Sequence, residues 1–588
     1  MLFYDFECYK YEWLVVVLDM AERKEHVIVN DREQLEALYN ANKDNIWVGF
    51  NSRHYDQYIL KGILCGFNPK EINDFIIEKG EAGWKYSSLF RNIPLNNYDV
   101  MLGTDGGLKT FEGFMGNDIK ESSVPFNIQR KLTPEEIAEV IKYCRHDVEQ
   151  TVEVFLRRKE EFDTMMYFIN HFSYPLSYIS KTKSQLAAAI LGGNAKGKDF
   201  KDEFDFPILK CLDLKKYKHI AEWYKNPENF DYEKSQIVEV AGVQHIFAWG
   251  GIHGAKGTVA KLSKGELVID KKNSTPVNEK GIFLVIDVTA YYPSQQKRFK
   301  FGYRVMNNPE NFEFIHNSNI EYKKKGDKKA RLPFKIMDNA ISGQLKQKTS
   351  TLYDPMSNNS ICVNGQLMLL DLIEHLEAKI KLNLIQSNTD GIIIRLNNYD
   401  EFDIVDDVVY EWEKRTGMEM EIDTFIGEIY QKDVNNYLLI DRETGAIKSK
   451  GAYIKSLSEL DYDLPIVNKA VVDFMTKGVP VERTILECDE LKEFQQVKKI
   501  SSKYDYILHG GKRLKEKCVR CFASRDDSDG GLTKIHSQTK RAAKIENTPE
   551  CAFLYNGSVN GVKCPSKLDK KWYIEMANKR LNDFGVMM

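Results

Sequence analysis

Two aspartates in the middle of the chain have the setting of metal ligands. Asp287 ends the run GIFLVID, which is apolar enough for a buried strand. Asp390 stands at the tip of KLNLIQSNTDGIIIRL (381–396), where small polar residues between two apolar runs indicate strand, tight turn and strand. A carboxylate between buried strands needs a partner or a metal ion. We therefore expect Asp287 and Asp390 to meet and to hold two Mg²⁺ ions, which activate an oxygen nucleophile and neutralise phosphate charge.

A second set of acids lies near the start of the chain. Asp5 and Glu7 are two apart in the strand-like FYDFECY, so both side chains point to one face. Asp56 follows the apolar stretch IWVGF, which predicts a strand that ends in a loop or helix start. Tyr143 and Asp147 are four apart in a helical pattern, so they are neighbours on one helix surface. Four carboxylates from three elements are hard ligands that suit Mg²⁺ or Mn²⁺.

The helix expected to carry Asp147 has clear boundary signals. Thr133 is a good N-cap, Pro134 suits the first helical position and Glu136 completes a capping box. Apolar residues then recur at helical spacing through residues 137–155. Asp147 borders this apolar stripe, where an unpaired carboxylate would be costly.

Taken in order, these acids follow a known pattern. Asp-x-Glu, Asn-x3-Tyr-Asp and Tyr-x3-Asp resemble the three motifs of the DEDDy 3′–5′ exonucleases, the proofreading kind. In that family the four acids bind two metal ions and the tyrosine orients the attacking water. The resemblance implies that the ligands are Asp5, Glu7, Asp56 and Asp147, with Tyr143 as the orienting residue. It also implies contacts with single-stranded DNA from Asn51, Tyr55 and Leu108, the last in GGLKTFEGF beside Lys109.

The sequence around the two central aspartates resembles family B DNA polymerases. The first motif of that family, Asp-x-x-Ser-Leu-Tyr-Pro-Ser, reads DVTAYYPS here, and the third, Asp-Thr-Asp-Ser, reads NTDG. The resemblance implies metal ligation by Asp287, the Val288 carbonyl and Asp390. It implies that Tyr292 packs under the sugar and excludes a 2′-hydroxyl. Asn388 replaces the first aspartate of the third motif, which in the family is a supporting residue more than a ligand.

Between these motifs, KIMDNAISGQL resembles the second polymerase motif, Lys-x3-Asn-Ser-x-Tyr-Gly, which lies on a helix. Lys335 and Asn339 are four apart, so they share one helical face, where a lysine can meet triphosphate oxygens. Ser342 stands where the family has a tyrosine. The implied nucleotide-binding residues are Tyr291, Tyr292, Lys335 and Asn339.

Two further segments resemble family segments that hold DNA. WGGIHGAKG resembles the Tyr-x-Gly-Gly segment that contacts the template, and its Gly250 and Gly251 let the backbone approach a phosphate closely. QKDVNNYLLIDRETGAIKSKGAY resembles the Lys-x-Tyr segment that holds the primer terminus. Tyr437 fits this segment, whereas Asn435 occupies the lysine position. Lys450, in the strand that follows, is the candidate to supply the missing charge.

The resemblance covers nearly the whole chain and implies a fold of the α/β and α+β multidomain class. An RNase H-like exonuclease domain is followed by a right-hand polymerase with palm, fingers and thumb. The expected boundaries are 1–170 for the exonuclease domain, 171–240 for a helical connector, 241–300 and 350–480 for the palm, 301–349 for the fingers and 481–588 for the thumb.

Composition and charge favour a cytoplasmic protein. Of 588 residues, 43% are hydrophobic and 29% are charged, and no apolar run is long enough to cross a bilayer. No secretory signal opens the chain, and ten cysteines lack the close spacings of a disulfide framework. Although the net charge is −3, residues 491–588 carry 20 Lys and Arg against 11 Asp and Glu. We expect this basic end to hold duplex DNA through its phosphates.

These features together predict a DNA-dependent DNA polymerase that adds dNTPs to a primer 3′ end and proofreads with a 3′–5′ exonuclease. The compact length favours a bacteriophage-type enzyme of viral DNA replication in the host cytoplasm. Expected partners are primer–template DNA, single-stranded DNA, dNTPs and replisome accessory proteins, with the enzyme itself a monomer. Only 48 positions separate Asp287 from Lys335, which leaves no room for the long insertion of protein-primed relatives and favours a nucleic-acid primer.

Two alternatives stay open. Departures from the family pattern favour a 3′–5′ exonuclease whose polymerase half is a degenerate, DNA-binding platform; they are Asn388, Ser342 and Asn435. A DNA-binding scaffold without activity would require the acids to be purely structural, and their placement at motif positions argues against it.

Overall fold

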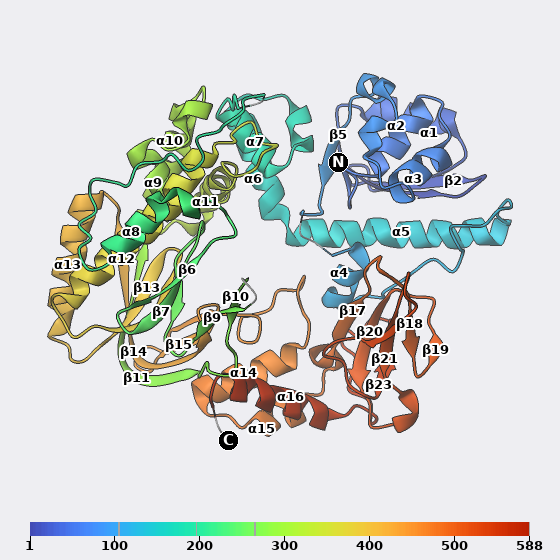
Figure 1. Ribbon diagram of the computed structural model, residues 1–588. Coiled ribbons are helices and arrows are strands. Elements are labelled where there is room, and N and C mark those ends of the chain that lie inside the picture. The colour runs from blue at the N-terminus through green and yellow to red at the C-terminus, as the bar shows by residue number, and fades with distance from the viewer. Residues whose placement is uncertain (104–105, 196, 264–265, 587–588) are drawn as a thin grey trace. The chain divides into compact units, whose positions relative to one another are not determined.

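The chain folds into two compact units that both mix helices and sheets (Figure 1). The computed structural model describes residues 1–103, 106–195, 197–263 and 266–586. The first unit holds Met1–Thr182, Leu457–Ile466 and Ile485–Tyr573, and the second holds Lys183–Ser456, Val467–Thr484 and Ile574–Met588. The expected mixed α/β, multidomain character is therefore confirmed. None of the helices described in these ranges is both long and apolar enough to span a membrane.

The first unit is built on a five-stranded sheet of order β3-β2-β1-β4-β5. Its strands are β1 (Leu2–Cys8), β2 (Trp13–Asp19), β3 (Lys24–Val29), β4 (Ile46–Gly49) and β5 (Asn96–Asp99). β1 pairs antiparallel with β2 and parallel with β4, and β4 pairs parallel with β5. The chain can return to a parallel neighbour only through a crossover, which here contains the helix α1 (Arg32–Asn42).

Helices around this sheet carry Asp56 and Asp147, the acids of the second and third exonuclease-like motifs. They are α2 (Asp56–Leu64), α3 (Pro69–Ile77), α4 (Leu108–Met115), α5 (Pro134–Arg157) and α6 (Lys159–His171). The expected start of α5 is confirmed, because Thr133 and Glu136 form the reciprocal capping box and Pro134 is the first helical residue. The apolar stripe of α5 packs on β1 and β2, with Val140, Cys144 and Val148 buried.

Two small antiparallel sheets complete the first unit. One has the order β17-β20-β23 and the other β19-β18-β21-β22. Their strands are β17 (Gln496–Lys499), β18 (Tyr504–His509), β19 (Lys512–Arg513), β20 (Cys518–Ala523), β21 (Leu532–His536), β22 (Ala542–Lys544) and β23 (Ala552–Leu554). Arg520 on β20 is fully buried and donates to the carbonyls of Gly113 and Asn117 at 2.9 and 2.7 Å. This part of the expected thumb thus packs on α4.

The second unit contains a nine-stranded sheet of order β16-β15-β14-β11-β13-β12-β8-β7-β6. The strands are β6 (Gln236–Val240), β7 (Val243–Phe247), β8 (His253–Ala255), β11 (Val277–Val288), β12 (Asn383–Asn388), β13 (Gly391–Leu396), β14 (Met420–Asp433), β15 (Asn436–Asp441) and β16 (Ile447–Lys450), and a separate ribbon joins β9 (Ala260–Ser263) to β10 (Glu266–Ile269). The hairpin expected within residues 381–396 is confirmed, with Asn388 paired to Gly391 across the turn.

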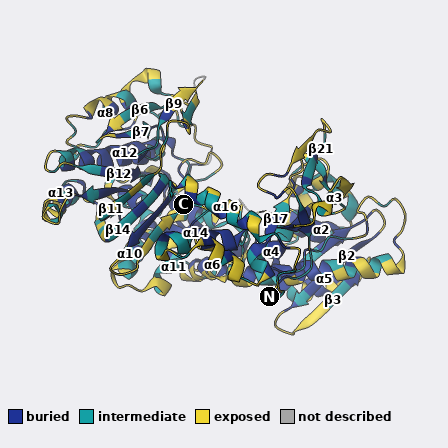
Figure 2. Cartoon of the chain, turned by 90° about the horizontal axis from the view of Figure 1, so that it is seen from below, coloured by how far each residue is buried: buried dark blue, intermediate teal, exposed yellow. Residues whose placement is uncertain are grey.

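Side-chain alternation along β11 separates two faces of this sheet. Leu284 and Ile286 join the core formed with α12 (Pro355–Glu377) and α13 (Glu401–Thr416), and Figure 2 shows α12 as a buried helix. Phe283 and Val285 belong to a second cluster on the opposite face. Asp287, two residues after Val285, therefore faces away from α12.

The remaining helices of the chain complete both units. α7 (Lys183–Ile190), α8 (Lys218–Lys225), α9 (Tyr291–Phe299), α10 (Pro309–Lys324) and α11 (Lys328–Ser342) lie in the second unit, and α14 (Pro465–Lys477), α15 (Val481–Glu487) and α16 (Lys570–Asp583) contain the later chain crossings between units. The segment 171–240, expected as a helical connector, is only partly helical, because residues 197–217 form no regular helix or strand. Gly192 and Gly193 follow the end of α7 and Pro207 lies within this stretch, and each opposes a continuing helix.

Candidate active sites

The structure brings Asp287 and Asp390 together, as the sequence analysis expects. Asp287 is the register partner of Gly391, and the Val288 amide donates to the Asp390 carbonyl at 2.8 Å. Both aspartates line a cavity of about 220 Å³. The polar residues that share this cavity are Gln386, Asn388, Tyr437, Lys448 and Lys450. Two carboxylates in one cavity form a donor set that suits hard divalent cations.

The environment of Asp390 differs from the sequence-based expectation. Leu384 and Ile385 on one side, and Ile392 on the other, are buried, but Asp390 itself is exposed. The apolar flanks belong to the strands β12 and β13, whereas Thr389 and Asp390 form the turn that joins them. The prediction of a buried carboxylate was therefore wrong, although the carboxylate still lines the cavity.

Asp287 has a basic partner that the sequence analysis did not identify. The Nζ atom of Lys448 lies 2.6 Å from Asp287 Oδ2. Burial raises the pKa of Asp287, Lys448 opposes that rise, and the negative charges of Asp390 and Glu421 reinforce it. Lys448 and Lys450 are two apart on β16, so period-two spacing could have placed both on one face of the sheet.

The turn after Asp287 leads directly to the two expected nucleotide-binding tyrosines. Ala290 adopts a left-handed conformation with φ of 45°, which sharply turns the chain from β11 into α9. Tyr291 is buried and its hydroxyl donates to the Gly365 carbonyl at 2.7 Å. Tyr292 is half-buried, and its hydroxyl hydrogen-bonds with Cys362 of α12. A direct contact of Tyr291 or Tyr292 with a nucleotide stays a prediction.

Lys335 and Asn339 are both exposed on α11, as helical spacing predicts. Ser342, at the position of the family tyrosine, donates to Gln296 Oε1 of α9 at 2.9 Å. A further lysine was missed: Lys323 on α10 donates to Thr289 Oγ1 at 3.1 Å and pairs with Glu421. Lys323 therefore stands beside the strand end that carries Asp287.

The expected DNA-contact segments lie close to the two central aspartates, one against the hairpin turn of Asp390 and one in the cavity that both aspartates line. A Cβ atom on Gly251 would lie 2.6 Å from Thr389 Oγ1, so this glycine permits close approach to the hairpin tip. The Gly250 carbonyl accepts from Gln366 Nε2 at 2.7 Å. Tyr437 is the register partner of Lys450, and both line the cavity of Asp287. These contacts gather the segments, but none of them tests DNA binding.

The second candidate site gathers the four N-terminal acids within the first unit. Asp5 and Glu7 lie on β1, and their carboxylates lie within 4.8 Å of one another and of Cys144 Sγ. Asp56 begins α2 and accepts from the Phe6 amide at 3.1 Å, which fixes it against β1. Asp147 lies on α5, four residues after Tyr143. Asp56, Glu7 and Asp147 all lie near enough to Asp5 for their negative charges to raise its pKa, so the four carboxylates expected from three elements gather around β1.

A lysine borders this acid cluster on the side of Asp147. Lys109 pairs with Asp147, lies 3.0 Å from Glu112 Oε1, and stands 4.5 Å from the centre of the Tyr143 ring. Glu112 is fully buried, and His146 Nε2 lies 3.5 Å from its other carboxylate oxygen. Sequence reasoning missed Glu112, although Lys109 and Glu112 are three apart on a helix and could have been paired on that ground.

The loop before α2 places the expected single-strand contacts. Asn51 has a φ of 61°, and its amide donates to Asp99 Oδ1 at 2.8 Å. The Tyr55 hydroxyl donates to Asn73 Oδ1 at 2.8 Å. Leu108 begins α4 and is partly buried. Asp99 anchors the loop through its carboxylate, and no sequence motif indicated that role.

Burial makes these carboxylates unusually easy to protonate. The pKa values of Asp5 and Glu7 are raised well above their ordinary range by burial and by the neighbouring negative charges. Burial also raises the pKa of Asp56 to about 7 and that of Asp147 to about 6, where Lys109 limits the rise. A cluster of buried acids with mutually raised pKa values is a donor set that divalent cations stabilise in its ionised form.

The stability of the metal-free protein is expected to fall as pH rises through this cluster. Since Asp56 binds its proton more tightly in the folded chain (pKa about 7) than in its ordinary state (3.8), unfolding free energy decreases between those pH values. Divalent cations offset the repulsion, so MgCl₂ should raise the melting temperature more at pH 8 than at pH 5. Calorimetry of the parent and of Asp56→Asn, with and without metal, measures the difference; an equal metal effect at both pH values contradicts the prediction.

Comparisons with known proteins give a distant likeness. No protein-family profile matches the chain. Over 270 residues, 37% of this chain, it is 26% identical to DNA polymerase 1 of Aeropyrum pernix, and the match spans 27% of that protein's length. A family B DNA polymerase from the hyperthermophilic archaeon Pyrobaculum calidifontis aligns with 100% of this chain and 78% of its own, with 14% identity and a TM-score of 0.40. The chain is thus similar, over about a third of its length, to a DNA polymerase.

Proposed function

We propose that this protein is a DNA-dependent DNA polymerase with a 3′–5′ proofreading exonuclease. The observation that carries the proposal is the meeting of Asp287 and Asp390 in one cavity with Tyr437, Lys448 and Lys450. The separate four-acid cluster of the first unit supports the exonuclease activity. The polymerase likeness over 270 residues supports the same reaction class.

In the proposed synthesis, Asp287 and Asp390 hold two Mg²⁺ or Mn²⁺ ions. Held by these two carboxylates, such ions would supply Lewis-acid activation of the primer 3′-hydroxyl and neutralisation of the triphosphate charge. Lys323 and Lys335 supply positive charge to the triphosphate oxygens. Tyr292 packs beneath the incoming sugar and excludes a 2′-hydroxyl.

On the DNA side, Tyr437 and Lys450 hold the primer terminus. Gly250 and Gly251 let the template backbone approach the hairpin that carries Asp390. These contacts act on phosphate and sugar, so they are independent of base sequence and sensitive to salt.

In the proposed proofreading reaction, the ligands of two further ions are Asp5, Glu7, Asp56 and Asp147. Tyr143 orients the attacking water, and Lys109, beside its ring, neutralises part of the cluster's charge. Single-stranded DNA enters over Asn51, Tyr55 and Leu108. The sheet order β3-β2-β1-β4-β5, with acids on its central strand, supports an RNase H-like assignment of this domain.

Finer features of the proposal rest on the sequence resemblance. They are the palm, fingers and thumb boundaries, a bacteriophage-type role in viral DNA replication in the host cytoplasm, a nucleic-acid primer, a monomeric state and replisome accessory partners.

Primer extension tests the proposal. The protein is incubated with a primer–template, four dNTPs and MgCl₂, and separately with a 3′-recessed or single-stranded oligonucleotide without dNTPs. We expect extension in the first reaction and stepwise 3′ shortening in the second. Chelation with EDTA should abolish both activities, and a protein that does neither with Mg²⁺ or Mn²⁺ refutes the proposal.

A second candidate is an exonuclease whose polymerase half only binds DNA. The Lys448–Asp287 ion pair favours it, because a lysine amine stands where a metal ion would be ligated. Asn388, Ser342 and Asn435 point the same way. This alternative predicts shortening of single strands and no incorporation of dNTPs in the same assay.

The variant Gly391→Ala should lower primer extension at least about tenfold. A Cβ atom there would lie 2.1 Å from Asp287 Oδ1 and 2.5 Å from the Ile286 carbonyl oxygen, so the Asp287 side chain must move. Small shifts of a catalytic group cost about this much in rate. Gly103→Ala, where a new Cβ meets no atom within 4 Å, is the matched control. Equal extension rates for both variants contradict the prediction.

A further inference from the structure

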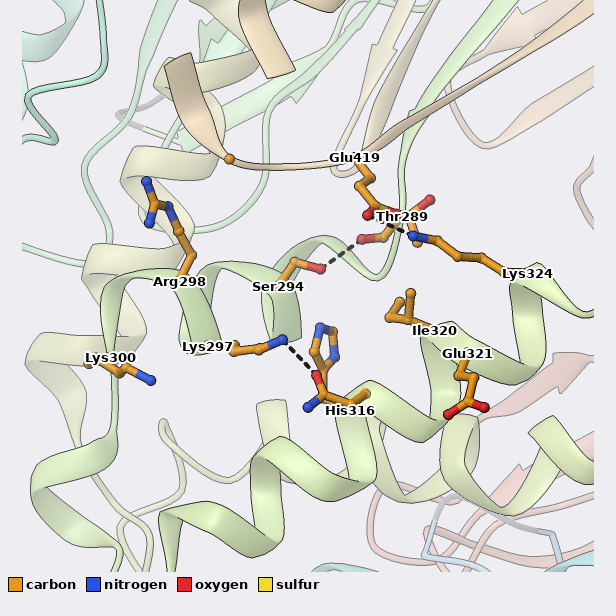
Figure 3. A pocket seen from close by; sticks show the side chains of 12 residues that line it. Thr289, Ser294, Lys297, Arg298, Lys300, His316, Ile320, Glu321, Lys324 and Glu419 are labelled. Carbon is orange, nitrogen blue, oxygen red and sulfur yellow. Dashed lines mark hydrogen bonds and ion pairs between the residues drawn. The ribbon is translucent and has the colours of Figure 1, made fainter. Parts of the chain in front are cut away.

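A larger cavity, of about 680 Å³, lies between α9 and α10 in the second unit (Figure 3). It shares no lining residue with the cavity of Asp287 and Asp390. The side chains that line it are mostly polar or charged and come from α9, α10, the turn before α9 and the segment before β14. Figure 3 shows Lys297, Arg298 and Lys324 around its wall.

The charges in this cavity do not cancel. Lys324 pairs with Glu419 at 2.9 Å and Lys300 pairs with Glu313 at 2.7 Å. The other carboxylate in the wall, Glu321, pairs with Lys325 at 2.5 Å. Lys297 donates to a neutral group, the Asn317 side-chain oxygen, at 2.6 Å. Within the part of the chain that the structure describes, neither Lys297 nor Arg298 has a carboxylate at ion-pair distance.

The cavity also borders the turn that follows the proposed metal ligands. Thr289 lines it, two residues after Asp287, which corresponds to about 7 Å along an extended chain. The Ser294 hydroxyl, also in the wall, donates to the Thr289 carbonyl at 2.9 Å. The left-handed Ala290 closes this turn. An anion held against Thr289 would therefore lie next to the turn that follows Asp287 and outside the cavity that Asp287 and Asp390 share.

We propose that this cavity binds a polyphosphate group, supplied either as free pyrophosphate or as the triphosphate of a nucleotide. Arg298 offers a planar fork of N–H donors that suits phosphate oxygens, and Lys297 offers a mobile point charge. The volume lies within the range of small-molecule pockets, about 300–1,000 Å³. The physiological source rests on the proposed function, because polymerisation releases one pyrophosphate for each nucleotide added.

Calorimetric titration of the full chain with inorganic pyrophosphate tests the site without DNA or dNTPs. The double variant Lys297→Gln/Arg298→Gln should weaken pyrophosphate binding at least tenfold relative to the parent. Lys381→Gln, an exposed lysine just before β12, is the matched control and should bind like the parent. The charge-conserving pair Lys297→Arg/Arg298→Lys should restore most of the affinity, which a merely structural role of these side chains would not require.

Competition experiments distinguish free pyrophosphate from a nucleotide triphosphate, and both from single-stranded DNA, as the group that the cavity binds. Competition by dATP identifies the nucleotide triphosphate as a second source, whereas binding of pyrophosphate alone identifies the product. Equal affinities of the parent and the double variant, with unchanged melting temperatures, overturn the proposal, as does a parent that binds no pyrophosphate. A variant-sensitive affinity for single-stranded DNA that pyrophosphate does not displace makes the cavity a strand contact and also overturns it. Because this titration contains no primer, its result stands even if the protein extends none.

Discussion

The variant Asp287→Asn is expected to lose primer extension by at least about 10³-fold. Asparagine keeps the size and hydrogen-bonding capacity of the side chain but removes the negative charge that would ligate a divalent ion. It also leaves Lys448, now 2.6 Å from Asp287, opposite a neutral amide, so positive charge builds up where cations must bind. The loss should therefore appear in the rate of the chemical step, which single-turnover extension with saturating dNTP measures.

A control acid in the same unit separates ligation from general charge effects. Asp406→Asn, exposed on α13, removes an equal charge away from the cavity and should extend like the parent. The 3′–5′ shortening of single strands by Asp287→Asn should be unchanged, because the N-terminal acids lie in the other unit. Parent-like extension by Asp287→Asn would refute the synthetic role and leave the degenerate-polymerase alternative.

The contact between Asp287 and Asp390 could be predicted because its causes are local. Asp287 ends one apolar strand and Asp390 occupies the turn of an apolar hairpin, and antiparallel pairing of β11 with β13 brings the two ends together. The boundaries of α5 were equally predictable, because Thr133, Pro134 and Glu136 encode its start. In each case a short stretch contains the residues that determine the geometry.

The partner of Asp287 depends on the whole sheet. Lys448 lies on β16, which two strands, β15 and β14, separate from β11. Its ion pair with Asp287 therefore requires the sheet to coil so that its edge approaches its centre. No spacing in the sequence encodes that curvature. The same holds for Arg520, whose contacts with the carbonyls of Gly113 and Asn117 join segments about four hundred positions apart.

The sequence also did not predict correctly how deeply single acidic side chains are buried. The apolar flanks of Asp390 predicted a buried side chain, but Asp390 lies in the turn between β12 and β13 and is exposed, although both strands are largely buried. Conversely, Glu112 looks like an ordinary helix surface residue in sequence, yet it is fully buried against Lys109 and His146. A carboxylate tolerates that position because Lys109 supplies a compensating positive charge and the Lys120 amide donates to Glu112 Oε2 at 3.3 Å.

The double variant Asp5→Asn/Glu7→Gln should lose 3′–5′ exonuclease activity by at least about 10³-fold. Asp5 is half-buried and Glu7 is buried in one carboxylate cluster, so the isosteric amides remove two anionic oxygen ligands and preserve packing. Because burial and mutual repulsion raise both pKa values, their ionised forms destabilise the metal-free fold, and removing them should leave the melting temperature equal or higher at pH 8. Loss of activity with undiminished stability is a combination that a folding defect does not produce.

Glu149→Gln provides the matched control for this double variant. Glu149 is exposed on α5, two residues after Asp147, and its loss should leave shortening of a single-stranded oligonucleotide at the parent rate. Primer extension by the double variant should persist, because Asp287 and Asp390 are untouched, while mismatched primer ends should no longer be removed before extension. Should the double variant still trim mismatched ends at the parent rate, the buried acids around β1 would be structural, and the proofreading half of the proposal would have to be withdrawn without affecting the case for synthesis.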